Sequence, residues 1–263
     1  MKIDILSLFP NLFEGAFTES IIKRAVETGK VEINIHNFRD YTNDIHGNVD
    51  DTPYGGGCGM VLMCQPIFDC INSLKTEDSV IIMMTPSGKV YNQQMAYDLS
   101  KKKHLILLCG HYEGFDERIR SICDMEISIG DYVLTGGEIP SMVLVDSITR
   151  LLPGVIQEES HLNESFNNGL LDYPVYTKPS VYNGLEVPSV LLSGDHKKID
   201  EYRYSESLRK TKEMIRKQQL ELEEQRQKKN KTKKENPQKV KNDKAVDNKE
   251  QPENKYLLLF CNK

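Results

Sequence analysis

The sequence lacks the features of a membrane, secreted or zinc-binding protein. No apolar run approaches the roughly 20 residues that a membrane-spanning helix needs. The first residues, MKIDILSLFP, are too short and lack the small-residue cleavage site of a signal peptide. The six cysteines form no C-x-x-C pair, which disfavours a zinc site or a redox motif. We therefore expect a cytoplasmic protein with reduced thiols.

Positive charge is scarce over most of the chain. Residues 1–208 carry 17 Lys and Arg against 30 Asp and Glu, whereas residues 209–263 carry 17 against 9. The whole-chain charge of −5 therefore hides an acidic body and a basic tail. With 263 residues and an apolar fraction of 38%, the chain is expected to form one main core with an appendage.

Short apolar runs alternate with segments of helical spacing, a pattern typical of an α/β fold with a mostly parallel sheet. The predicted strands are Ile3–Phe9, Val31–Phe38, Val80–Met84 and Leu105–Cys109. The predicted helices are Leu12–Val26, Pro66–Leu74, Asn92–Leu99 and a strongly buried helix that begins near Pro140 and stops at Pro153-Gly154.

The second half of the chain changes character at three points, which predict the domain boundaries. We expect the α/β domain over residues 1–156 and an irregular connection over residues 157–188, where apolar periodicity fails. Residues 189–226 are expected to form a small helical domain. Residues 227–263 are rich in Lys, Asn, Glu and Gln, and we expect them to be disordered because they cannot bury enough apolar surface.

Three glycine-rich segments are candidates for ligand binding. The first, residues 54–60, reads YGGGCGM and matches neither a P-loop nor G-x-G-x-x-G, which disfavours kinase and dinucleotide functions. The second (residues 109–114) and third (residues 129–138) follow predicted strands, where open α/β sheets bind ligands. They predict a cleft for a small ligand with apolar and polar parts. The alternative is that the glycines only permit tight turns.

Two charged residues are candidates for catalysis. Arg150 lies near the end of the predicted buried helix, where a guanidinium needs an anionic partner or a ligand. Glu164 lies in the irregular connection, where a carboxylate on a mobile segment could act as a base once substrate binds. A structural ion pair and a solvated carboxylate are the alternatives. The histidines His111, His161 and His196 suggest no metal triad, and a metal site stays unknown.

Eight strings occur in an order that resembles the bacterial tRNA (guanine-N1)-methyltransferases of the trefoil-knotted SPOUT class. They are SLFP (residues 7–10), VDDTPYGGGCGM (49–60), TPSG (85–88), CGHYEGFDER (109–118), SIGDYVLTGGE (128–138), RLLPGV (150–155), GLLDYPVYTKP (169–179) and VPSVLLSGDH (187–196). The resemblance extends from Met1 to about Thr211 and implies methylation of the guanosine 3′ to the anticodon.

The resemblance also implies the fold, the partners and the donor site. It implies a SPOUT catalytic domain with a C-terminal knot, a helical tRNA-binding domain, a homodimer that holds the tRNA anticodon stem-loop, and Mg²⁺ without an identifiable ligand set. S-adenosylmethionine is the expected methyl donor. Its site maps to Met84, Thr85, Pro86, Gly110, Glu113, Ile129, Gly130, Asp131, Tyr132, Val133, Leu134, Gly136, Gly137 and Pro140.

The implied chemistry needs a base near guanine N1 and a positive group near O6, where negative charge develops. Arg150 matches the family arginine that would serve as the positive group near O6. Glu164 takes the position of the family's Asp base, with one more methylene. His111 stands where the family usually has Arg, which removes a permanent charge. These departures leave two alternatives: a noncatalytic RNA-binding relative, and an enzyme that acts on another RNA nucleotide.

Local positive charge offers a docking surface for tRNA on the otherwise acidic body. Its candidates are Lys178, Lys197, Lys198, Arg203, Arg209 and Lys210. The alternative is an ordinary solvated helix face.

Overall fold

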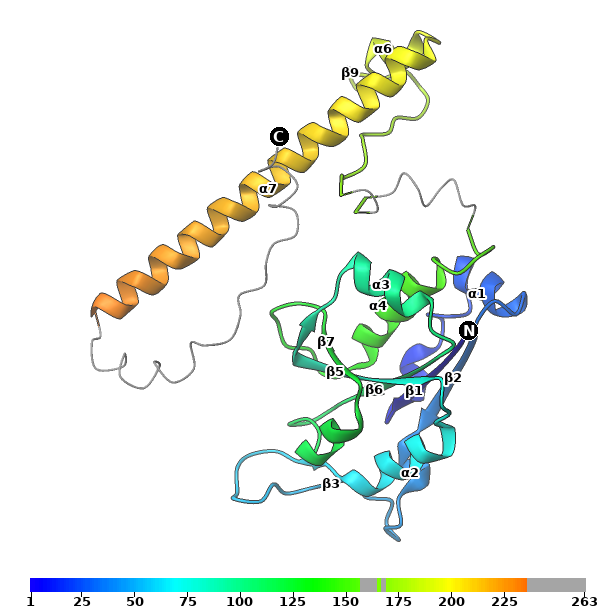
Figure 1. Cartoon of the computed structure of the whole chain (residues 1–263), viewed down its shortest axis with the longest axis vertical. Coiled ribbons are helices and arrows are strands. Elements are labelled where there is room, and N and C mark those ends of the chain that lie inside the picture. The colour runs from blue at the N-terminus through cyan, green and yellow to red at the C-terminus, as the bar shows by residue number, and fades with distance from the viewer. Residues whose placement is uncertain (157–164, 167–168, 236–263) are drawn as a thin grey trace. The chain divides into compact units, whose positions relative to one another are not determined.

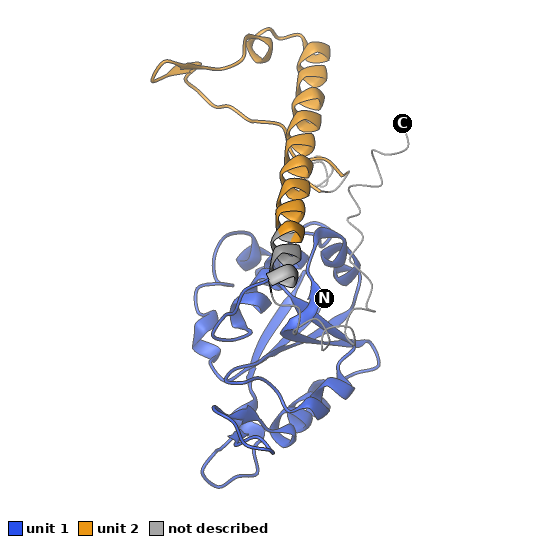
Figure 2. Cartoon of the chain, turned by 90° about the vertical axis from the view of Figure 1, so that its left-hand side faces the viewer, with its two compact units in different colours: residues 1–161 blue, residues 162–263 orange. Residues whose placement is uncertain are grey.

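The computed structural model describes residues 1–156, 165–166 and 169–235 (Figure 1). The chain divides into two compact units, residues 1–161 and residues 162–263 (Figure 2). No helix in the described part of the chain combines the length and apolar character that crossing a membrane requires.

Unit 1 contains a five-stranded sheet in the order β2-β1-β6-β5-β7, in which every neighbouring pair is parallel. The strands are β1 (Lys2–Ser7), β2 (Glu32–Asn37), β5 (Ser79–Val90), β6 (His104–Cys109) and β7 (Met125–Ser128). The predicted α/β class and parallel sheet are therefore confirmed. β5 runs further than predicted, past a register shift between Met84 and Lys89.

Helices cover both faces of this sheet, as continuously apolar strands require. In β1, Ile3 and Ile5 belong to one core cluster with residues of α3 and α4, while Leu6 belongs to the opposite cluster with residues of α2. The helices are α1 (Ser20–Glu27), α2 (Cys64–Leu74), α3 (Gln93–Ser100) and α4 (Glu138–Thr149), with 3-10 turns η1 (Pro10–Phe13), η2 (Phe38–Tyr41) and η3 (Glu117–Ile122). The short strands β3 (Asp50–Asp51) and β4 (Val61–Leu62) pair antiparallel.

The single helix predicted over Leu12–Val26 is wrong. The structure has η1 there and starts α1 only at Ser20. Gly15 has a φ of +84°, which interrupts a right-handed helix. The other three predicted helices of unit 1 are confirmed, with boundaries within about two residues for α2 and α3.

Unit 2 contains a hairpin of β8 (Val181–Tyr182) and β9 (Leu185–Glu186), then α6 (Ser189–Leu192) and α7 (His196–Glu235). α7 continues past the predicted end at Arg226, because Lys, Glu and Gln have a high intrinsic preference for helix. The rest of the tail predicted to be disordered, residues 236–263, lies outside the described residues, as do residues 157–164 of the predicted connection.

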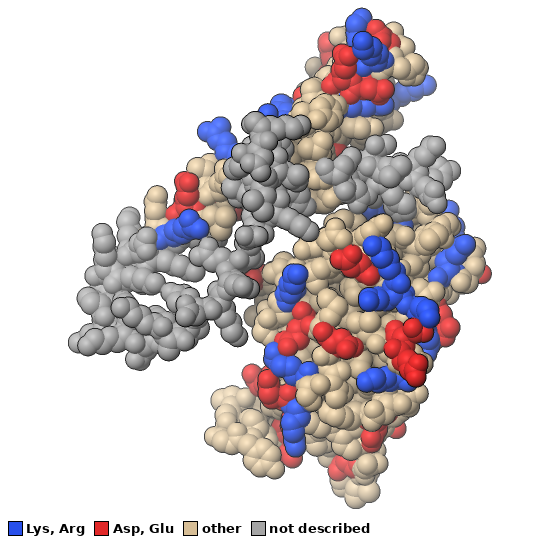
Figure 3. Space-filling view, in the orientation of Figure 1, with Lys and Arg blue, Asp and Glu red and all other residues tan. Residues whose placement is uncertain are grey.

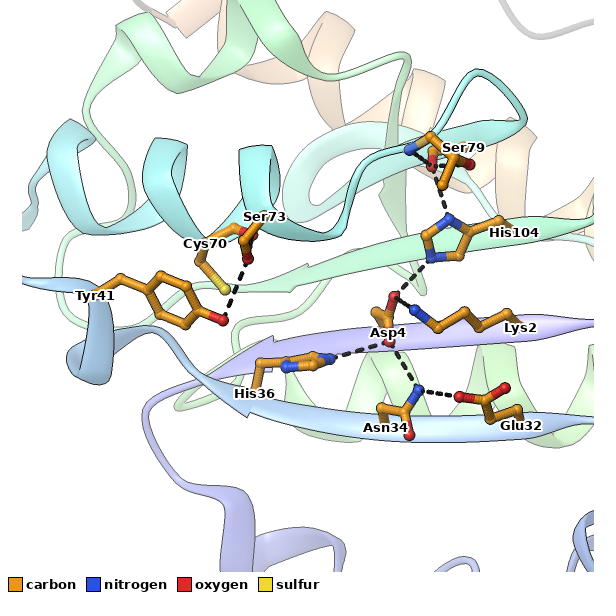
Figure 4. Close-up of polar contacts among 11 residues, drawn as sticks. Lys2, Asp4, Glu32, Asn34, His36, Tyr41, Cys70, Ser73, Ser79 and His104 are labelled. Carbon is orange, nitrogen blue, oxygen red and sulfur yellow. Dashed lines mark hydrogen bonds and ion pairs between the residues drawn. The ribbon is translucent and has the colours of Figure 1, made fainter.

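A buried carboxylate joins three neighbouring strands (Figure 4). Asp4 in β1 is fully buried and accepts hydrogen bonds from Lys2 Nζ (2.8 Å), His36 Nε2 (3.0 Å), Asn34 Nδ2 (3.1 Å) and His104 Nε2 (2.7 Å). Burial alone would raise the pKa of Asp4, but these hydrogen bonds outweigh burial and lower the pKa to about 2. The ionised form is therefore the one that fits this site.

This pKa predicts an acid-dependent contribution to stability. Because the folded-state pKa lies below the ordinary value of 3.8, ionised Asp4 stabilises the fold above about pH 4, and this stabilisation is lost as the pH falls toward 2. We expect the difference in free energy of unfolding between the wild type and Asp4→Asn to shrink by about 2 kcal/mol from pH 5 to pH 2. Urea unfolding followed by circular dichroism measures it. Asp78→Asn, which changes an exposed carboxylate paired with Lys103, is the control, and a difference for Asp4→Asn that stays constant would contradict the prediction.

Candidate functional site

A cavity of about 400 Å³ opens beside the register shift of β5 and at the carboxyl ends of β6 and β7. Its walls are formed by residues 83–86 within β5, the last residues of β7, the segments that follow β6 and β7, and the first turn of α4. Thirteen of the fourteen predicted donor-site residues line it: Met84, Thr85, Pro86, Gly110, Glu113, Ile129, Gly130, Tyr132, Val133, Leu134, Gly136, Gly137 and Pro140. The remaining one, Asp131, lies in the same loop but does not line the cavity. The volume is that of a small-molecule site.

The second and third glycine segments lie against each other beside this cavity. Gly137 N–H donates to the Gly110 carbonyl oxygen at 3.0 Å, and a Cβ on Gly137 would lie 2.6 Å from the Cα of Cys109. A Cβ on Gly110 would lie 2.6 Å from the Phe115 ring. Gly137 therefore permits the close approach of the two loops, Gly110 makes room for Phe115 of its own loop, and both glycines line the cavity. The glycines can therefore both permit tight turns and form part of a ligand-binding cleft.

The first glycine segment packs against the second instead of lining the cavity. Glu113 N–H donates to the Met60 carbonyl oxygen (3.0 Å), and Leu62 N–H donates to that of Gly114 (2.9 Å). Gly59 has a φ of +85°, and a Cβ there would lie 2.4 Å from Cγ of Glu113. Residues 54–60 thus support the loop that carries Glu113.

A buried carboxylate also ties the cavity to β1. Glu138, the first residue of α4, is 2% exposed. It accepts hydrogen bonds from the Ser7 hydroxyl (2.5 Å) and from His111 Nε2 (2.8 Å). The His111 ring lies 4.5 Å from that of Phe9. His111 therefore has a carboxylate partner at the position where the resemblance leads one to expect arginine.

Several cavity residues were not predicted to bind the donor. They are Met83, His111, Tyr112, Gly114, Phe115, Asp116, Glu117, Arg120, Ile127, Ser128 and Thr135. Most of them flank predicted residues within the strings CGHYEGFDER and SIGDYVLTGGE. Including every residue of these strings would therefore have predicted most of the missed cavity residues.

The two predicted catalytic residues are not brought together by the described structure. Arg150 directly follows α4, where its N–H donates to the Asp146 carbonyl oxygen at 3.2 Å, and it does not line the cavity. Glu164 lies outside the described residues. The sequence prediction for this pair therefore stays a prediction.

Cys109 sits beside the cavity but is unsuited to nucleophilic catalysis. Burial, with a smaller contribution from the Glu138 charge, raises the pKa of its thiol far above the ordinary value. Its Sγ lies 3.1 Å from the Ser141 hydroxyl. The thiol therefore stays protonated.

The positive residues predicted to dock tRNA lie in unit 2, and four of the six have polar partners there. Lys198 pairs with Asp195 (3.0 Å), Arg203 with Asp200 (3.6 Å) and Arg209 with Glu206 and Glu213 (2.7 Å each). Lys210 Nζ donates to the Asp172 carbonyl oxygen (2.6 Å). On the face of unit 1 seen in Figure 3, charges of both signs are interspersed. Neither distribution forms a surface of one sign.

Comparison with known proteins gives consistent matches. The family model described as tRNA (Guanine-1)-methyltransferase TrmD matches residues 1–223. A protein of Dictyoglomus turgidum named tRNA (guanine-N(1)-)-methyltransferase is 55% identical over 212 residues, which cover 80% of this chain and 86% of the relative. Proteins of the same name from Malacoplasma penetrans and Clostridioides difficile are 57% and 56% identical, covering 81% of this chain in each case and 94% and 95% of the relatives.

The contact between the two loops predicts that Gly137 tolerates no side chain. Gly137→Ala would place a methyl group against the backbone of Cys109, and neither backbone can yield without moving its loop. We expect the free energy of unfolding to fall by about 1–3 kcal/mol. Urea titration measures it. Thr135→Ala, an exposed change in the same loop, should stay within about 0.5 kcal/mol, and an equally small effect of Gly137→Ala would contradict the prediction.

Proposed function

The chain belongs to the tRNA (guanine-1)-methyltransferase family, and from this premise we propose that it transfers a methyl group from S-adenosylmethionine to N1 of the guanosine 3′ to the anticodon. The observation that carries the proposal is the cavity beside the register shift of β5 and the carboxyl ends of β6 and β7, which gathers thirteen of the residues that the resemblance assigns to the donor.

The lining of the cavity suits this donor chemically. Met84, Ile129 and Leu134 supply apolar surface for an adenine ring, while the loop backbones supply N–H and C=O groups that select its polar edge. Glycine at positions 110 and 137 lets those backbones approach closely. The donor sulfonium would then lie between the second and third glycine segments, which would fix its orientation toward the incoming guanine.

Methyl transfer to guanine N1 requires that the N1 proton leave. In the proposed mechanism, Glu164 accepts this proton, and Arg150 stabilises the negative charge that develops on O6. Orientation of N1 toward the methyl carbon replaces a bimolecular encounter and supplies much of the rate. The guanine must leave the anticodon-loop stack to reach the donor, as in other enzymes that act on a base.

The wider assembly is proposed on the resemblance alone. We propose a cytoplasmic homodimer, a trefoil knot at the end of the catalytic domain, and a helical domain that contacts the tRNA anticodon stem-loop. The domain boundaries at residues 156 and 188 belong to this proposal, whereas the expected boundary at residue 226 falls within α7. α6 and α7 support a helical character for the second domain.

Mg²⁺ is part of the proposal as a requirement without a site. Among the described residues there is no group of three or more His, Cys, Asp or Glu side chains that could hold a metal ion. Mg²⁺ commonly binds through one or two carboxylates, waters and substrate oxygens. No step of the mechanism above depends on the ion.

The proposed reaction predicts strict dependence on one nucleotide. We expect labelled methyl groups from S-adenosylmethionine to enter an unmodified tRNA transcript that carries guanosine after the anticodon, with recovery as 1-methylguanosine. The matched transcript with adenosine at that position should incorporate none. Incorporation at another nucleotide would show that the enzyme methylates a different position in RNA. Donor binding without incorporation would favour the noncatalytic alternative.

The proposed roles of Glu164 and Arg150 predict losses in the chemical step. Glu164→Gln should lower the single-turnover rate by about 10²–10⁴-fold, because the amide accepts no proton. Arg150→Ala should lower it by about 10²–10³-fold, because O6 loses a charged donor. The dissociation constant of S-adenosylhomocysteine, measured by calorimetry, should change little in both. Glu164→Asp is the control that keeps a base, and wild-type rates in Glu164→Gln would exclude this residue as the base.

A further inference from the structure

Glu138 is a buried carboxylate at the junction of three segments. Its side chain accepts hydrogen bonds from the Ser7 hydroxyl, at the end of β1, and from the His111 ring, in the loop after β6. Glu138 is also the first residue of α4. Ser7 also accepts a hydrogen bond from Phe9 N–H at 2.9 Å. An ionised carboxylate with so little exposure is costly unless a positive partner or several donors offset the loss of water.

Histidine is the residue type whose charge most often responds to pH near neutrality, and His111 is the one histidine in this network. With a neutral ring, Nε2 offers Glu138 a hydrogen bond. With a protonated ring, the same contact becomes an ion pair between two opposite charges with little exposure to water, which strengthens it. The strength of the link between the β6 loop and α4 therefore depends on pH.

The His111 ring also contacts the third glycine segment directly. A Cβ on Gly136 would lie 2.2 Å from His111 Nε2 and 2.4 Å from Glu138 Oε2. The backbone at Gly136 thus rests on the histidine–glutamate pair, and Gly136 and Gly137 line the cavity next to Gly110. Movement of the pair moves a wall of the proposed donor site.

The surroundings of His111 contain no second ion pair for its ring among the described residues. The end of β1 presents Ser7, the following segment presents the Phe9 ring, α4 presents Glu138, and the neighbouring Tyr112 ring lies 6.3 Å away. The other ionisable residues that line the cavity are Glu113, Asp116, Glu117, Arg120 and Tyr132.

We propose that His111 is a positioning residue whose protonated ring, paired with Glu138, holds the third glycine segment in the geometry that binds the methyl donor. This inference rests on the proposed function, because it takes the cavity as the donor site. Donor affinity is then greater when the His111 ring is charged than when it is neutral.

The test compares the wild type with His111→Gln, which keeps a neutral N–H donor, and His111→Arg, which keeps a permanent charge. The dissociation constant of S-adenosylhomocysteine is measured by calorimetry from pH 5.5 to 8.5 without tRNA. Relative to His111→Gln, the wild type should bind about tenfold more tightly at pH 5.5, and this advantage should shrink toward pH 8.5. This ratio cancels the titration of the ligand and of the other cavity residues. His111→Arg should retain the tight binding at both pH values.

A ratio of wild type to His111→Gln that stays constant with pH would overturn the proposal, whatever the behaviour of His111→Arg. Glu138→Gln supplies a second comparison, because removing the carboxylate charge should abolish the pH dependence in a protein that still contains His111. A wild-type protein that fails to bind S-adenosylhomocysteine at any pH would contradict the proposed function itself. The two failures are therefore distinguishable.

Discussion

The close approach of the loop after β6 to the loop after β7 is the constraint on which the site depends. Parallel strands end at one edge of the sheet, so the loops that follow them compete for the same space. Gly137 resolves this competition, since its N–H bonds to the Gly110 carbonyl where a Cβ on Gly137 would meet the Cys109 backbone. The cavity exists because these two loops can touch without side chains between them.

Two buried carboxylates anchor opposite ends of the same sheet. Asp4 is held by residues of β1, β2 and β6, with a pKa lowered to about 2, and it secures the strands away from the cavity. Glu138 connects β1, the β6 loop and α4 at the cavity itself. Each carboxylate is costly to bury alone and favourable once its donors are in place. The hydrogen bonds of these two buried carboxylates therefore fix the positions of neighbouring strands and loops relative to one another.

Apolar periodicity was sufficient to predict the parallel sheet and three helices of unit 1, because burial on both faces leaves continuous apolar strands. It missed the break at Gly15, whose positive φ no apolar pattern reports. The β8–β9 hairpin was also missed, although Asn183-Gly184, with φ values of +51° and +76°, is a strong hairpin signal. The pairing of His111 with Glu138 joins residues 27 positions apart and follows only from the sheet order. The cavity position of the second and third glycine segments was predictable from their places after strands, whereas that of the first segment, which lines no part of the cavity, was not.

The central claim is that the cavity between the second and third glycine segments binds the methyl donor. Hydrogen–deuterium exchange of backbone amides, with and without S-adenosylhomocysteine, tests it directly. If the donor binds there, the ligand slows exchange in residues 84–86, 110–114 and 129–137 and leaves β1, β2 and α2 unchanged. Protection confined to other segments, with saturating ligand bound, would contradict it.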